Sequence, residues 1–142
     1  MIQRIVVGVD GSDNAVDALA WAVDLAQCVG AEVVAVHAVG LLEASATHDE
    51  ASRNARLRRF ETQWCAPLST SDVARRLLLV DGDPVSALLR TASEVDGDLL
   101  VVGSRGVGDR SELLLGSTST QVSQRSTLPV VVVPARRDRD TG

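Results

Sequence analysis

The stretch Ile5-Val6-Val7-Gly8-Val9-Asp10-Gly11-Ser12 carries the clearest structural signal in the chain. Its apolar, β-branched start predicts a strand that is buried on both faces and runs from Ile2 to Val9. The Asp-Gly pair then predicts a turn, after which Ser12 or Asp13 can cap a helix. Small and apolar residues continue at helical spacing as far as Gly30, which suits a helix exit. The stretch therefore predicts the first half of a strand–helix–strand unit.

The rest of the chain repeats this alternation of apolar strands and helices. Further strands are predicted at Glu32 to Ala38, Val73 to Val80, Asp98 to Gly103 and Leu128 to Val133. Further helices are predicted from Asp49 to about Cys65, where Pro67 ends the helix, from Asp83-Pro84 to Val95, and from Gly116 to about Ser126. Five strands alternating with four helices are typical of an α/β, Rossmann-like domain, with a parallel sheet and helices on both faces.

Ligands of such sheets bind beyond the carboxyl ends of the strands, where the winding reverses. The 142 residues fit one domain, which we predict to span residues 1–135. Residues 136–142 are predicted to be a disordered charged tail.

Composition excludes several classes of function. The net charge of −5 argues against a general nucleic-acid or membrane-surface binder. All 14 basic residues are arginine, so the P-loop and Schiff-base lysines are both absent. No apolar run is long enough for a membrane span, and a cytoplasmic protein is the expectation.

Cysteine and histidine give no sign of catalysis or metal binding. Cys28 and Cys65 lack the spacing of a redox or zinc motif, and both are expected to be inert reduced thiols. Cys28 lies in an apolar helical run and is predicted to pack as a small hydrophobe. His37 is expected to point into the packing of the sheet and His48 into solvent. Neither has a catalytic partner placed by a motif, and no catalytic residue is predicted.

Glycines recur where a predicted strand ends and the last predicted helix begins. Gly103 and Gly106 follow the strand, and nine residues later Gly116 and Ser117 open the helix. A phosphate chain needs backbone N–H groups with no Cβ in the way, and a helix N-terminus adds donors and a favourable dipole. Ser117 and Ser119 add hydroxyl groups. The alternative reading is that these glycines only make turns and a helix cap.

This spacing from Gly103 to Ser117 resembles the ATP-binding motif of the universal stress proteins. The likeness covers nearly the whole chain, through residues 5–12, 34–39, 82–84 and 129–133. It implies a parallel sheet of strand order 3-2-1-4-5 and ATP binding, with Mg²⁺ held mainly by the phosphates rather than by side chains. It also implies a homodimer, formed through the last strand at Val130–Val133.

The resemblance also implies roles for individual residues. The phosphates would be lined by Gly103, Gly106, Gly116 and Ser117, with Arg105, Thr118 and Ser119 beside them. Asp10 would meet the ribose and adenine side, and the backbone of Ala38 would contact adenine. Asp109 and Glu112 lie between the two halves of the motif and would repel phosphate unless they point away or Mg²⁺ intervenes.

Three functions remain open at this point. The first is an ATP-binding regulatory module of the stress response, which is not an enzyme. The second is a slow ATP hydrolase or phosphotransferase, for which Asp10, Asp109 and Glu112 are the candidate residues. The third is a dimeric scaffold that binds cAMP or no nucleotide. The sequence does not rank ATP against ADP, AMP or cAMP.

Overall fold

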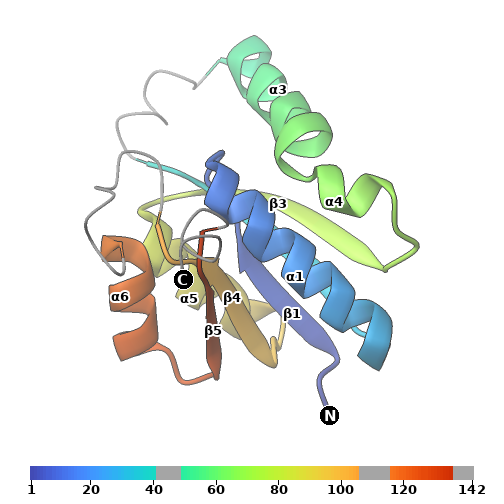
Figure 1. The fold of residues 1–142 in the computed structure, drawn as a ribbon. Helices are drawn as coiled ribbons and strands as arrows, with labels where there is room; N and C mark the ends of the chain where they lie inside the picture. Colours follow the sequence, from blue (N-terminus) through green and yellow to red (C-terminus); the bar gives the residue numbers. More distant parts are fainter. Residues whose placement is uncertain (41–48, 106–115, 136–142) are drawn as a thin grey trace.

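The computed structural model describes residues 1–40, 49–105 and 116–135, which form a five-stranded sheet between layers of helices (Figure 1). The strands are β1 (Arg4–Gly8), β2 (Glu32–Val39), β3 (Arg75–Asp81), β4 (Leu99–Gly103) and β5 (Val130–Val133). All pair in parallel, in the order β3-β2-β1-β4-β5. The predicted fold class and strand order are therefore confirmed.

The described helices are α1 (Asp13–Val29), α3 (Glu50–Arg59), α4 (Ala66–Ser69), α5 (Pro84–Glu94) and α6 (Ser117–Arg125). A π-helical segment, η1 (Phe60–Trp64), joins α3 to α4. None of the helices in the described ranges is long and apolar enough to cross a membrane.

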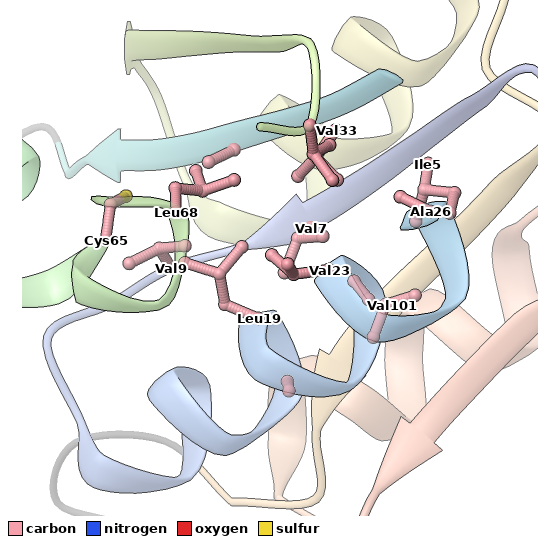
Figure 2. Close-up of a cluster of buried hydrophobic side chains, with 14 of the residues drawn as sticks. Ile5, Val7, Val9, Leu19, Val23, Ala26, Val33, Cys65, Leu68 and Val101 are labelled. Atoms are coloured by element: carbon pink, nitrogen blue, oxygen red, sulfur yellow. The ribbon is translucent and has the colours of Figure 1, made fainter. Parts of the chain in front are cut away.

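Both faces of the sheet are buried because helices pack on each of them, and side chains alternate between the two faces along each strand. Val7 of β1 packs with Leu19 and Val23 of α1 and with Leu68 of α4, on the face that Figure 2 shows. Val6 belongs to the opposite face and to a second cluster, which α5 and α6 cover. Burial on both faces explains why the strands read as continuous apolar runs.

The winding of the chain reverses between β1 and β4. From β1 the chain proceeds through β2 to β3 on one side, and it then returns to form β4 and β5 on the other side. The register pairs Val6 of β1 with both Val34 and Leu100, so the carboxyl ends of β1, β2 and β4 lie at one edge. This is the edge at which ligands bind in open parallel sheets.

Local signals set the limits of α1. The Ser12 hydroxyl accepts a hydrogen bond from the Ala15 backbone N–H at 3.1 Å, so Ser12 rather than Asp13 is the N-cap. Gly30 ends the helix in the left-handed conformation with φ 72°, which glycine adopts at no steric cost.

Two sequence predictions about local structure are wrong. Pro67 does not end a helix but lies in the first turn of α4, where its missing N–H costs nothing. The helix before it changes to π geometry from Phe60 to Trp64.

Cys28 is exposed on α1 rather than packed, whereas Cys65 is buried, and both thiols are free.

Candidate functional site

A pocket opens at the carboxyl edge of the sheet, where the winding reverses. Its lining comprises Gly8, Val9, Asp10, Ala15, Val36, Ala38, Pro84, Leu88, Val102, Gly103, Arg105, Thr118 and Ser119. Most of these residues are apolar, and among them only Asp10 and Arg105 carry charge. A mainly apolar cleft with a few polar groups is the usual form of a small-molecule site.

The pocket gathers most of the residues singled out in the sequence. Asp10, Ala38, Gly103, Arg105, Thr118 and Ser119 all line it. Gly116 and Ser117 lie at the start of α6, as N-cap and first residue, and are not part of the lining. Gly106, Asp109 and Glu112 fall outside the described residues, as do His48 and the predicted tail.

Asp10 stabilises the turn between β1 and α1 and also lines the pocket. Its Oδ1 accepts hydrogen bonds from the Ser12 backbone N–H at 2.9 Å and from the Ser12 hydroxyl at 2.6 Å. Because Ser12 also caps α1, one chain of hydrogen bonds runs from Asp10 to the first turn of the helix. The Asp10 carboxylate is exposed and remains at the mouth of the pocket.

Gly103 is required by packing within the protein. A Cβ at position 103 would lie 2.8 Å from Cγ of Asn14, which occupies the space beside the end of β4. The sequence predicted this glycine for the approach of a phosphate, but the close contact with α1 requires it with or without a ligand.

Two backbone amides of the predicted phosphate cradle already have partners in the protein. The Arg105 N–H donates to Oδ1 of Asn14 at 2.7 Å, and the Gly116 N–H donates to the carbonyl of Ser104 at 2.5 Å. The amides that open α6 have no carbonyl one turn earlier in the helix, and the N-cap Gly116 has no side chain to bond them. Among the described residues beside the pocket, the groups that can attract an anion are the α6 N-terminus and the Arg105 guanidinium.

The hydroxyl groups of α6 differ in their surroundings. Ser119 is buried, and its hydroxyl lies 3.2 Å from the Ser104 carbonyl and 3.1 Å from the Gly116 carbonyl. Ser117 is exposed, and Thr118 is half-buried in the pocket wall. Of the three, Thr118 is thus the hydroxyl best placed to meet a bound molecule.

His37 lies within the core, as the sequence predicted. Its Nδ1 is 2.8 Å from the Val9 carbonyl, and its Nε2 is 3.0 Å from Nη1 of Arg56. Because a carbonyl only accepts and a guanidinium only donates, Nδ1 carries the proton and Nε2 accepts. The centroid of its ring lies 4.8 Å from the ring centroid of Trp64. An imidazole engaged at both nitrogens is not available as a general base.

Side-chain carboxylates are few in the described part of the pocket. Within the described ranges, no group of three or more His, Cys, Asp or Glu residues is placed to hold an ion. Asp10 is the carboxylate among the described residues of the pocket lining.

A parallel α/β sheet with a pocket at its switch point defines a broad class of ligand-binding domains. The profile of the universal stress protein family matches residues 1–134, and the chain belongs to this family. It is 35% identical over 137 residues to a universal stress protein from Thermus aquaticus, covering 94% of this chain and 99% of that one.

Solved structures show the same fold. Universal stress protein UspA from Lactobacillus plantarum matches with a TM-score of 0.76 and 25% identity, covering 93% of this chain and 97% of that one. A universal stress protein solved in complex with cAMP matches with a TM-score of 0.67 and 31% identity, covering 94% and 98% of the two chains.

Proposed function

We propose that this chain binds an adenine nucleotide, ATP with Mg²⁺, in the pocket between β1 and β4, and acts as a nucleotide-responsive regulatory module of the stress response. The observation that carries the proposal is the composition of this pocket. Apolar walls lead to a helix N-terminus and an arginine at the switch point of the sheet.

The apolar walls suit the adenine base. Val36 and Ala38 of β2 and Leu88 of α5 form one side of the pocket. Because the His37 ring packs against Phe60 and Trp64 of η1, its neighbour Ala38 faces the opposite side of the sheet, the side that α5 covers. The small side chain of Ala38 leaves room for a planar ring, and its backbone lies at the edge where adenine would bind.

The phosphates would lie at the other end of the pocket. The α6 N-terminus contributes backbone donors and the positive end of a helix dipole, and Arg105 contributes a cation that can pair with phosphate. Mg²⁺ bound to the phosphates would balance the charge of Asp10 at the pocket mouth.

A regulatory role fits the described site better than catalysis does. Hydrolysis needs a group that positions water at the γ-phosphate. The described lining offers only Asp10 for this role, and the Asp10 carboxylate holds the turn before α1. We therefore expect no turnover in a single-turnover assay with radiolabelled ATP. Hydrolysis at a rate well above that of free ATP would favour the enzyme.

A cyclic nucleotide is the second candidate ligand, because a relative 31% identical to this chain was solved with cAMP. The two ligands differ in the charge that they bring to α6. ATP carries several negative charges there, whereas cAMP carries one. A negative charge introduced at the start of α6 should therefore weaken ATP binding more than cAMP binding.

The first test is mass spectrometry of the small molecules released when freshly purified protein is denatured, which identifies the ligand without assuming one. Calorimetry with ATP, ADP, AMP, cAMP and adenosine then ranks the affinities. An affinity for none of them would overturn the proposal, and a preference for cAMP over ATP would favour the second candidate.

Two variants map the two ends of the pocket. Ala38→Leu should weaken every adenine ligand, adenosine included, because its side chain fills the base side. Thr118→Asp should weaken ATP by about tenfold or more and adenosine by less than about twofold, since it adds negative charge only at the phosphate side. Gln121→Asp, on an exposed position of the same helix, is the matched control and should leave ATP affinity unchanged.

A further inference from the structure

Asn14 joins three segments at the edge of the pocket without belonging to its lining. It lies in the first turn of α1 and is only 6% exposed. Its Nδ2 donates to the Val133 carbonyl at the end of β5, at 3.1 Å. Its Oδ1 accepts from the Arg105 N–H at 2.7 Å and from the Ser104 hydroxyl at 3.2 Å, just beyond β4.

These partners require an amide side chain. The Val133 carbonyl can only accept a hydrogen bond, and the Arg105 N–H can only donate one. A side chain between them must therefore donate on one side and accept on the other. Aspartate would place an oxygen against the carbonyl, and leucine would leave both backbone groups without this partner.

The end of β4 is built to receive this amide. Gly103 lacks the Cβ that would lie 2.8 Å from Cγ of Asn14. The next residue, Ser104, donates its backbone N–H to the same Val133 carbonyl at 2.9 Å. The Asn14 amide thus sits at the point where the chain leaves the sheet.

The same point fixes the start of α6. The Ser104 carbonyl accepts from the Gly116 N–H at 2.5 Å and lies 3.2 Å from the Ser119 hydroxyl. Asn14 holds the peptide between Ser104 and Arg105 from one side, and the α6 N-terminus is attached to Ser104 on the other. Both anion-attracting groups of the pocket, Arg105 and α6, therefore depend on the place of this peptide.

We infer that Asn14 is a positioning residue for phosphate recognition: through Ser104 and Arg105 it sets where the phosphate end of the pocket lies. This inference rests on the proposed function. Asn14 acts on the ligand only through these neighbours, so its loss should affect the phosphates and spare the base.

The test compares ATP with adenosine in the full chain. Asn14→Leu keeps the approximate size of the side chain and removes both hydrogen-bonding groups. We expect ATP to bind about tenfold or more weakly while adenosine changes by less than about twofold. A merely structural role would lower the folded fraction and weaken both ligands equally, so the ratio of the two affinities is the informative quantity. A ratio within twofold of wild type would overturn the inference.

Controls separate positioning from general damage. Asn54→Leu alters an exposed asparagine on α3, and Thr91→Val removes a buried hydroxyl on α5. Both should keep the wild-type ratio. If Asn14→Leu does not fold, Asn14→Ser serves instead, because it shortens the side chain so that it no longer spans both partners and adds no bulk.

A second measurement needs no ligand. In wild-type protein the Arg105 and Gly116 amides should be protected from hydrogen exchange, and Asn14→Leu should speed exchange at both by about tenfold or more. Faster exchange in a protein that binds no nucleotide would overturn the proposed function, and with it the role in phosphate recognition, but would show that Asn14 holds the peptide between Ser104 and Arg105. Unchanged exchange at both amides would overturn the positioning role even where ATP binds.

Discussion

At the scale of single residues, Gly103 shows how little space separates the end of β4 from α1. A Cβ there would lie 2.8 Å from Cγ of Asn14 and 3.0 Å from its backbone carbonyl, which cannot move without moving the helix. We therefore expect Gly103→Ala to lower the free energy of unfolding by about 1–3 kcal/mol, the usual cost of overpacking. Urea unfolding would measure it. Gly40→Ala, whose Cβ meets nothing within 4 Å, is the control and should cost much less.

The two cysteines should differ sharply in reactivity. Burial raises the pKa of the Cys65 thiol to about 12, and the charge of Glu61 adds to this effect, so almost no thiolate exists at neutral pH. Cys28 is exposed on α1. A thiol reagent at pH 8 should label one cysteine in native protein and two in denaturant, with Cys28→Ser removing the fast reaction. Fast native labelling of Cys65 in that variant would contradict the structure.

At the scale of elements, the stability that an aspartate N-cap gives to a helix depends on pH. Asp83 is the N-cap of α5, and the Ser86 backbone N–H, which donates to its carboxylate at 3.0 Å, holds its pKa below the ordinary 3.8. A pKa lowered by folding stabilises the protein above the unfolded-state value, and this contribution is lost as pH falls through the folded-state value. The cap should therefore matter most at neutral pH and fade in acid.

We expect Asp83→Ala to lower the free energy of unfolding by about 1 kcal/mol at pH 7. The difference from wild type should shrink as the pH falls below 3.8 toward 2. Asp98, whose pKa is lowered by the backbone N–H groups of Gln3 and Arg4, is present in both proteins and cancels in the comparison. Asp83→Asn retains a cap that does not titrate. A difference between Asp83→Ala and wild type that stays constant with pH would contradict this account.

The elements also show what sequence alone can predict. Strands buried on both faces leave continuous β-branched runs, and caps such as Ser12 and Asp83 act within one helical turn. The strands and the helix starts can therefore be predicted from the local sequence. The exposure of Cys28 cannot be predicted in this way, because it depends on which side of α1 meets the sheet. Asn14 was also missed in the sequence, because its partners Arg105 and Val133 lie 91 and 119 residues away and no local pattern marks them.

At the scale of the whole molecule, the two edges of the sheet differ. The edge strand β3 begins with exposed Arg75 and Arg76 and ends with exposed Asp81, and charged edges discourage pairing with another chain. The other edge, β5, consists of four valines, three of them only half-buried. We therefore expect self-association to use β5, in keeping with the homodimer that the family resemblance implies.

The backbone of β5 indicates which residue to change. The Pro129 and Val133 carbonyls accept from Leu100 and Ser104 on the β4 side, so by alternation the backbone groups of Val132 face the free edge. Val132→Pro removes the outward N–H and preserves the bonds to β4, which proline tolerates at such positions. Ultracentrifugation should find wild type at twice the chain mass of 15.0 kDa and this variant at the mass of one chain. Val132→Thr keeps the N–H and should remain dimeric. A monomeric wild type, or a dimeric Val132→Pro variant, would show that the β5 edge is not a dimer interface.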